Sequence, residues 1–450
     1  MTATATPETA KSLQELAPDI TPRVRDGDLA TTQYALLGLG AVLAGLGFWL
    51  GGHGPLSYLV GYMGVIGVCL GALFFTMIQH ITSAGWSVPV RRVTENIAGT
   101  LPYMLLLFLP IVVGFDDIYH HWTHAVIEKN ADGSLPKGYD AVIAGKSGYL
   151  NSTFFFVRVA VIFGIWIALA TYFRSQSIKQ DESGDPAITQ RLRRVAAPGL
   201  LMFALTTTFA SFDWIMSIDP HWFSTIFGVA FFAGAVMASL AVTILLTAWL
   251  KKRGYYNEGA ITQEHYHDVG KLMWAFMLFW TYTNFSQYML IWYANLPEET
   301  VWYAHRTEHG WGAIGPALII GHFAFPFVFL MSRHMKRNKT VLSIGAAYLL
   351  AIHCIDMQYL ILPSGLSGHG DGHGHGGDGG VSAGDSAGEH AHGFGAQLGE
   401  YLHTISWADF GCFAGLLCLV GGLTIMNVRR SNLIPLRDPR LNEALHFHNI

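Results

Sequence analysis

The sequence predicts an all-α integral membrane protein with about ten transmembrane helices. Of its 450 residues, 51% are hydrophobic and only 13% are charged, whereas soluble domains carry roughly 25% charged residues. Long apolar runs recur along the chain, and their continuous, non-alternating pattern disfavours a β-barrel. The net charge of −4 gives no basic excess of the kind that nucleic-acid binding needs.

Ten runs are long enough to cross a bilayer, since a helix needs roughly 20 mostly apolar residues to do so. The third run contains Pro102 and Pro110, and the eighth contains Pro316 and Pro326. Neighbouring helices in a bundle can satisfy the carbonyls that these prolines leave free. The 50 glycines suit close helix packing in lipid. The predicted spans are residues 32–50, 56–80, 98–114, 154–172, 195–212, 224–249, 272–292, 314–331, 341–362 and 407–426.

The distribution of Lys and Arg predicts that both termini are cytoplasmic, because basic loops favour that side of the membrane. On one side of the alternating loops lie 22 of the 27 basic residues, with 4 on the other side and Arg158 inside a span. The predicted division is a cytoplasmic segment at 1–31, a transmembrane domain at 32–427 with periplasmic loops at 117–153 and 364–400, and a cytoplasmic tail at 428–450.

Neither the cysteines nor the loop at 364–400 predicts an evolved metal or cofactor site. Cys69, Cys354, Cys412 and Cys418 all lie within predicted spans. They form no Cys-x-x-Cys or Cys-x-x-Cys-His pattern, which would indicate binding of haem, an iron–sulfur cluster or zinc. We therefore expect all four cysteines to be buried packing residues. The loop is rich in Gly, His and Asp, a composition typical of flexible linkers, and its histidines could bind a divalent metal only adventitiously.

Ionisable and polar side chains inside the spans carry most of the functional information. A charge at the bilayer centre costs about 3 kcal/mol or more, so such residues usually face the bundle interior. These polar residues lie at three depths in the membrane, so they could form a proton path or line a pocket for a quinone head group. The cytoplasmic group is His80, Thr94 and Glu95, the middle group is Asn284, Gln287, His322, His353 and Asp356, and the outer group is Asp116, Asp117, Arg158, Asp213 and Asp219.

The middle group contains the most informative spacing. His353 and Asp356 are three residues apart and therefore share one helix face. A carboxylate beside an imidazole can orient the ring and favour proton exchange near neutral pH, which a proton relay requires.

Each of these residues also has a plainer interpretation. His322 alone can be a hydrogen-bonded packing residue, Arg158 and Asp213 can form a structural ion pair, and Asp116 can cap a helix at the interface. A haem b site would need two facing histidines at one depth, and only His322 and His353 qualify. The sequence has no second pair of histidines on the same two spans, which two stacked haems would require.

Three segments resemble the NrfD-like membrane subunits of bacterial alternative complex III, in particular the second of the two such subunits. They are SFDWIMSIDPHWFSTIFG at 211–228, MWAFMLFWTYTNFSQYMLIWYANLPEE at 273–299 and HCIDMQY at 353–359. The resemblance extends over most of the chain, excluding the first thirty residues and the His/Gly-rich loop.

The resemblance implies a multi-pass subunit, in the bacterial inner membrane, of a quinol:cytochrome c or quinol:terminal oxidase oxidoreductase. It implies two four-helix bundles plus peripheral helices. The expected partners are the other NrfD-like subunit, an iron–sulfur subunit, haem c subunits and a terminal oxidase, without nucleic acid. The iron–sulfur clusters and haem c would lie on those partners, so this chain would hold no redox cofactor itself. Contact with menaquinone or ubiquinone is left open.

Under this interpretation the chain provides a proton path and structural support, with no catalytic residue and no metal. Two other functions stay open: a quinone-reactive NrfD-type anchor of another respiratory reductase, and a secondary transporter that works without redox partners. The proposed path runs from His80 and Glu95 through Asn284, His322, His353 and Asp356 to Asp116, Arg158 and Asp213.

Overall fold

The structure is a computed structural model that describes residues 29–130, 132–256, 259–370 and 393–448. The helices in these residues are α3 Leu29–Leu50, α4 Pro55–Ile81, α5 Val88–Ala98, α6 Leu101–Leu106, α7 Leu109–Val113, α8 Phe115–Ile118, α9 His120–Thr123, α10 Ala141–Lys146, α11 Ser152–Ser183, α12 Pro186–Trp214, η1 Met216–Ile218, α13 Phe227–Lys252, α14 Gln263–Ala294, α15 Pro297–Ala304, α16 Trp311–Leu318, η2 Ile319–Ala324, α17 Phe325–Met331, α18 Arg333–Arg337, α19 Lys339–Gly370, α20 Phe394–Thr404, α21 Trp407–Arg429 and α22 Leu441–Leu445.

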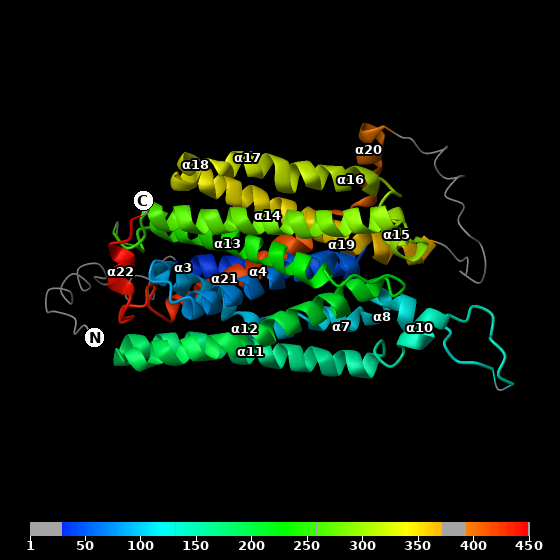
Figure 1. The fold of residues 1–450 in the computed structure, drawn as a ribbon, viewed down its shortest axis with the longest axis horizontal. Helices are drawn as coiled ribbons and strands as arrows, with labels where there is room; N and C mark the ends of the chain where they lie inside the picture. The colour runs from blue at the N-terminus through cyan, green and yellow to red at the C-terminus, as the bar shows by residue number, and fades with distance from the viewer. Residues whose placement is uncertain (1–28, 131, 257–258, 371–392, 449–450) are drawn as a thin grey trace.

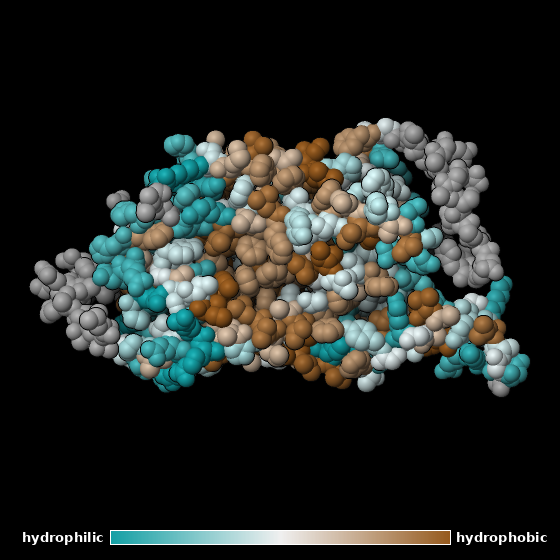
Figure 2. All heavy atoms as spheres, in the orientation of Figure 1, coloured by the Kyte–Doolittle hydropathy of each residue, from teal (hydrophilic) through white to brown (hydrophobic). Residues whose placement is uncertain are grey.

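The described residues form a helical bundle whose only β-pairing is an isolated bridge between Val126 and Tyr139. The long helices pack against one another with roughly parallel axes (Figure 1). Hydrophobic residues form a belt across the middle of the bundle, and hydrophilic residues gather at its two ends (Figure 2). Residues 1–28 of the first predicted segment and residues 371–392 of the His/Gly-rich loop lie outside the described residues.

Nine helical segments within the described ranges are long and apolar enough to cross a membrane, as expected for a multi-pass membrane protein. They are Leu29–Leu50, Pro55–Ile81, Val88–Val113, Ser152–Ser183, Pro186–Ile218, Phe227–Lys252, Trp311–Met331, Lys339–Leu366 and Trp407–Arg429. Each coincides with one of the predicted spans.

The remaining predicted span, residues 272–292, falls within α14. Its 32 residues give a length of about 48 Å at 1.5 Å per residue, which is enough to cross a bilayer. It packs beside α13 and α17 but carries Thr281, Asn284 and Gln287 in its C-terminal half, and it is less apolar than the other nine segments. That α14 crosses the membrane therefore stays a prediction.

The third span begins earlier than predicted. Arg91 and Arg92 were expected in a cytoplasmic loop, but both lie inside α5 and are buried. The expectation of a loop was wrong because Glu95, one turn further on, forms ion pairs with both guanidinium groups and makes their burial tolerable. Pro102 and Pro110 are the second residues of α6 and α7. In the first turn of a helix the backbone N–H groups have no intrahelical acceptor, so proline removes no helical hydrogen bond there.

The core is centred on α4, which is buried along nearly its whole length by α12, α13, α19 and α21. On the outside of the bundle, α3 packs closely on α21. A Cβ atom added to Gly40 would lie 2.6 Å from the carbonyl oxygen of Gly415, so this approach needs glycine. The four cysteines are unpaired, with Cys69, Cys354 and Cys412 buried and Cys418 half-buried.

Candidate functional site

Four side chains from three helical elements meet near the middle of the bundle. Trp280 lies halfway along α14, His322 lies in η2, and His353 and Asp356 lie halfway along α19. All four are buried, with at most 6% of any residue exposed. We call this set the mid-bundle cluster.

Asp356 connects the members of the cluster. Trp280 Nε1 donates a hydrogen bond of 3.1 Å to Asp356 Oδ2, and His353 Nδ1 lies 3.9 Å from the same oxygen. The latter distance is an ion-pair contact and is too long for a hydrogen bond. The rings of Trp280 and His322 pack with their centroids 3.8 Å apart. The structure thus places His353 and Asp356 on one helix face, as their spacing predicted.

The imidazoles of the cluster are incompletely paired. Both nitrogens of His353 and Nδ1 of His322 have no hydrogen-bond partner among the described residues. His322 Nε2 lies 3.2 Å from the sulfur of Met237, which is a weak acceptor. Because buried polar atoms are normally paired, these nitrogens point to a bound water or to a proton-exchange role.

The local backbone around His322 is unusual. Residues 319–324 form a π-helix, in which the N–H of Phe325 bonds to the carbonyl of Ile320, five residues earlier. Pro326 has no N–H and cannot bond to the carbonyl of His322, so the ordinary helical ladder is interrupted at this point. Single π-helical turns of this kind are frequent at functional sites.

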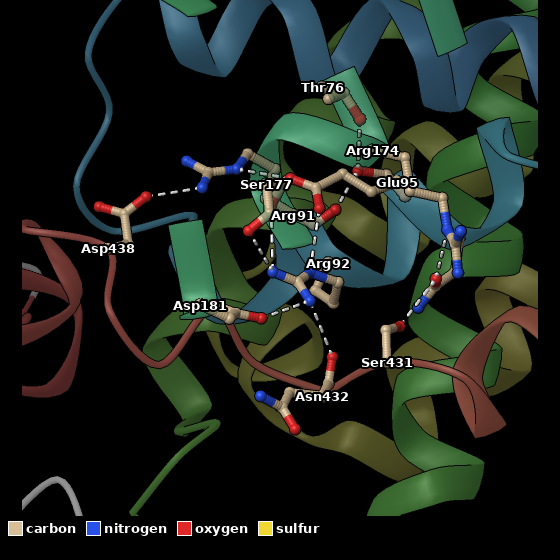
Figure 3. Close-up of polar contacts among 12 residues, drawn as sticks. Thr76, Arg91, Arg92, Glu95, Arg174, Ser177, Asp181, Ser431, Asn432 and Asp438 are labelled. Atoms are coloured by element: carbon tan, nitrogen blue, oxygen red, sulfur yellow. Dashed lines mark hydrogen bonds and ion pairs between the residues drawn. The ribbon is translucent and has the colours of Figure 1, made fainter. Parts of the chain in front are cut away.

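A second buried cluster lies at the end of the bundle where α5 begins and α21 ends. Glu95 forms ion pairs of 3.0 Å with both Arg91 and Arg92. Arg91 also pairs with Asp438 at 2.7 Å, and Arg92 with Asp181 at 2.8 Å. Figure 3 shows these five side chains turned toward one another. We call them the basic-end network; each of their charged groups has an opposite charge beside it.

The basic-end network joins segments that are distant in the sequence. It connects α5 with α11 and with the chain that follows α21, and Arg92 also donates to the carbonyl of Asn432 at 3.2 Å. Beside it, Arg174 donates to Asn96 at 3.1 Å (Figure 3). His80, at the end of α4, is buried against Phe173, and its Nε2 has no hydrogen-bond partner in the described chain. The structure therefore places both predicted entrance residues, His80 and Glu95, at this end.

At the opposite end of the bundle, Arg158 and Asp213 form the ion pair that was one of the predicted interpretations. Arg158 Nε lies 2.6 Å from Asp213 Oδ2, and the hydroxyl of Tyr149 donates to Oδ1 at 2.7 Å. The guanidinium also lies over the Tyr149 ring, 3.9 Å from its centroid. Both oxygens of Asp213 are thus occupied. Asp116, predicted to lie near this pair, is exposed on α8.

The two predicted amides of α14 make no hydrogen bond to the side chains of the mid-bundle cluster. Asn284 donates to the carbonyl of Trp280 at 2.9 Å within its own helix. Gln287 accepts from the hydroxyl of Ser224 at 3.1 Å and lies 3.5 Å from the hydroxyl of Tyr303. Gln287 is therefore part of a separate polar contact nearer the end of α14.

The sequence interpretation missed Arg306, which is almost fully buried between α15 and α16. It donates to the carbonyl oxygens of Tyr359 at 3.0 Å and Trp302 at 2.9 Å, and it lies 3.3 Å from the centroid of the Trp302 ring. Pro363 has no N–H, so the carbonyl of Tyr359 lacks its usual helical partner and is free for Arg306. Burial lowers the pKa of Arg306 to about 10, which leaves it charged at neutral pH.

A second missed residue is Asp409, in the first turn of α21. It accepts hydrogen bonds from the hydroxyl of Ser57 at 2.6 Å and from the backbone of Ser406 at 2.7 Å, and it pairs with His53 at 3.1 Å. Ser406 and Asp409 form a capping box, which is visible in the sequence as Ser-x-x-Asp before an apolar run. This pattern could have predicted the start of the helix but not the contacts with α4.

The described residues contain no group of three or more His, Cys, Asp or Glu side chains that could hold a metal ion. The mid-bundle cluster is almost fully buried, and its Trp280 and His322 rings pack against each other. No protein-family model and no curated protein matches this chain.

Proposed function

We propose that this chain is a proton-conducting and structural membrane subunit of a quinol-oxidising respiratory complex of the alternative complex III type. It corresponds to the second NrfD-like subunit, lies in the bacterial inner membrane with both termini cytoplasmic, and holds no redox cofactor itself. Haem c and iron–sulfur clusters belong to its partners, which pass electrons to a cytochrome c or a terminal oxidase. The three segments that resemble this subunit support the proposal, together with the nine apolar spans.

The proposal includes α14 as a tenth span and two four-helix bundles. The first bundle consists of α4, the segment α5–α7, α11 and α12, and the second consists of α13, α14, the segment α16–α17 and α19. Packing of α4 against α5 and α12, and of α13 against α14 and α19, supports this grouping. The pair α3 and α21 then forms the periphery.

The mid-bundle cluster is the observation that carries the proton-conducting part of the proposal. Ionisable residues at membrane depth are costly and are usually retained for function. Asp356 uses one carboxylate oxygen to accept from Trp280, while both nitrogens of the neighbouring His353 are unpaired. An imidazole can accept a proton on one nitrogen and release it from the other. A small side-chain movement or one bridging water closes the 3.9 Å gap between His353 and Asp356.

Proton entry from the basic end fits His80 better than Glu95. His80 has an unpaired ring nitrogen, whereas Glu95 is held by two guanidinium groups. The protein's part in the reaction is then to hold and move protons at His80, His353 and Asp356, and quinol oxidation itself takes place on other subunits. No step is assigned to quinone at the mid-bundle cluster, whose four residues are buried.

Purification of the native protein from its membrane in mild detergent tests the proposal. We expect a multisubunit complex that contains haem c and iron–sulfur clusters, visible by optical and paramagnetic resonance spectra, and that oxidises quinol with a cytochrome c or an oxidase as acceptor. A complex that instead reduces an inorganic sulfur compound would favour the anchor function. A single chain that purifies without haem would contradict the proposal and favour a transporter.

A further inference from the structure

One face of α14 carries a polar group that lipid cannot satisfy. Tyr282 is 65% exposed, and its hydroxyl makes no hydrogen bond within the described part of the chain. It lies ten residues from each end of the predicted span at 272–292, or about 15 Å at 1.5 Å per residue. With α14 as the proposed tenth span and a hydrocarbon core about 30 Å thick, Tyr282 lies near the middle of the membrane. A tyrosine side chain is too short to reach water from that depth.

The other exposed tyrosines of the described residues do not share this position. Tyr34 lies near the beginning of α3, and Tyr288 and Tyr293 lie in the last two turns of α14. Tyrosine at a helix end can point its hydroxyl to the membrane surface, where it is commonly found. Exposed positions halfway along other spans are apolar, as Leu201 on α12 illustrates. The hydroxyl of Tyr282 is therefore an exception that lipid contact does not explain.

Tyr282 belongs to a larger exposed surface on one side of α14. Phe285 follows Tyr282 by three residues, Met289 follows Phe285 by four, and both are exposed. The three side chains therefore lie on the same side of the helix. Asn284 is half-buried beside them. Its side-chain amide donates back to the carbonyl of Trp280, and its carboxamide oxygen has no hydrogen-bond partner among the described residues. Helices associate in lipid through such packing surfaces together with interhelical hydrogen bonds.

We infer that the face of α14 formed by Tyr282, Phe285 and Met289 binds a transmembrane helix of another subunit. That helix would present a hydrogen-bond acceptor to the Tyr282 hydroxyl near the middle of the membrane. The inference rests on the proposed function, since membership in a multisubunit membrane complex supplies the partner. It adds to that function the surface and the chemistry by which the partner is recognised.

Photo-crosslinking in the intact complex tests this inference. A photoreactive amino acid replaces Phe285, so that Tyr282 stays in place, and a second version carries it at Leu201 as a lipid-facing control. After irradiation of native membranes, the adducts are identified by mass spectrometry of the crosslinked peptides. We expect position 285 to join a transmembrane helix of a different subunit, and position 201 to give lipid adducts.

The hydroxyl is tested in the same system with Tyr282→Phe. Loss of one hydrogen bond between helices in lipid should lower the yield of the 285 adduct by about threefold. The matched change Tyr293→Phe, at the end of α14, should leave the yield unchanged. Lipid adducts alone at position 285, an adduct with a second copy of this chain, or equal yields for the two variants would overturn the inference.

The outcome is separable from that of the proposed function. Lipid adducts at position 285 in a complex that oxidises quinol would reject this surface and keep the function. A subunit adduct in a complex without haem or quinol oxidation would keep the surface as a helix-binding site and reject the function.

Discussion

The two buried clusters of this molecule differ in how completely their charges are paired. In the basic-end network, Arg91 and Arg92 each face two carboxylates, and Glu95 is shared between them. In the mid-bundle cluster, Asp356 has a single indole donor and the adjacent His353 has no hydrogen-bond partner in the described chain. Both clusters are buried, but only the basic-end network has its charges fully paired. Paired charges hold segments together, whereas the unpaired nitrogens of the mid-bundle cluster are the groups that we propose exchange protons.

The largest effect on stability is expected from Glu95→Gln. Removal of this charge leaves the buried guanidinium groups of Arg91 and Arg92 with one carboxylate fewer beside them. Breaking a buried ion pair typically lowers the free energy of unfolding by about 3–5 kcal/mol. Thermal unfolding in detergent measures the loss. As a control, Arg191→Gln breaks the exposed pair with Asp185 and should cost at most about 1 kcal/mol. Equal stability of the two variants would show that the network is not structural.

Arg306 differs from both clusters because its partners are carbonyl groups and an aromatic ring. Arg306→Met should destabilise the protein by about 1–3 kcal/mol, since the Tyr359 carbonyl loses its donor. Pro363→Ala restores an N–H that can bond to this carbonyl, so the double variant should be more stable than Arg306→Met alone. The four unfolding temperatures of this double-mutant cycle provide the measurement. Strictly additive changes would contradict the assigned role of Pro363.

A smaller effect is expected from His121, which lies outside the spans in α9. Burial and the neighbouring His120 lower the pKa of His121 to about 4, from an ordinary value near 6.5. The folded protein therefore binds fewer protons than the unfolded chain between these values. Its stability should be full above pH 6.5 and should fall, by an amount on the order of 1 kcal/mol given the partial exposure, as the pH drops toward 4.

The change His121→Gln tests this dependence, with the exposed His124→Gln as its control. Unfolding temperatures are compared at pH 7 and pH 4.5. We expect the difference between the two pH values to shrink in His121→Gln and to persist in His124→Gln. The same pH dependence in both variants would rule out His121 as its source.

Local patterns in the sequence predicted the features that depend on one helix. Apolar length predicted nine spans that the structure contains, and i,i+3 spacing predicted that His353 and Asp356 share a face. Contacts between distant segments were not predictable in the same way. Arg91 and Asp438 are separated by 347 positions, and nothing in either segment indicates the other. The hydrogen bond from Trp280 to Asp356 likewise depends on how α14 packs against α19.

The prolines show how a local signal can be visible while its consequence is not. Pro326 lies inside one predicted span, and Pro363 directly follows another. The sequence did not predict that the first would accompany a π-helix at His322 or that the second would free a carbonyl for Arg306. These outcomes depend on which side chains lie next to the freed carbonyl groups, and packing of other helices decides that.

The most direct test of the central claim is proton movement in the assembled complex after Asp356→Asn and His353→Ala. Vesicles that contain the purified complex are supplied with quinol and acceptor, and electron transfer and pH change are recorded together. We expect both variants to assemble and proton translocation to fall by about 100-fold or more, the usual contribution of a positioned acid or base. Unchanged quinol turnover together with unchanged proton translocation in both variants would contradict it.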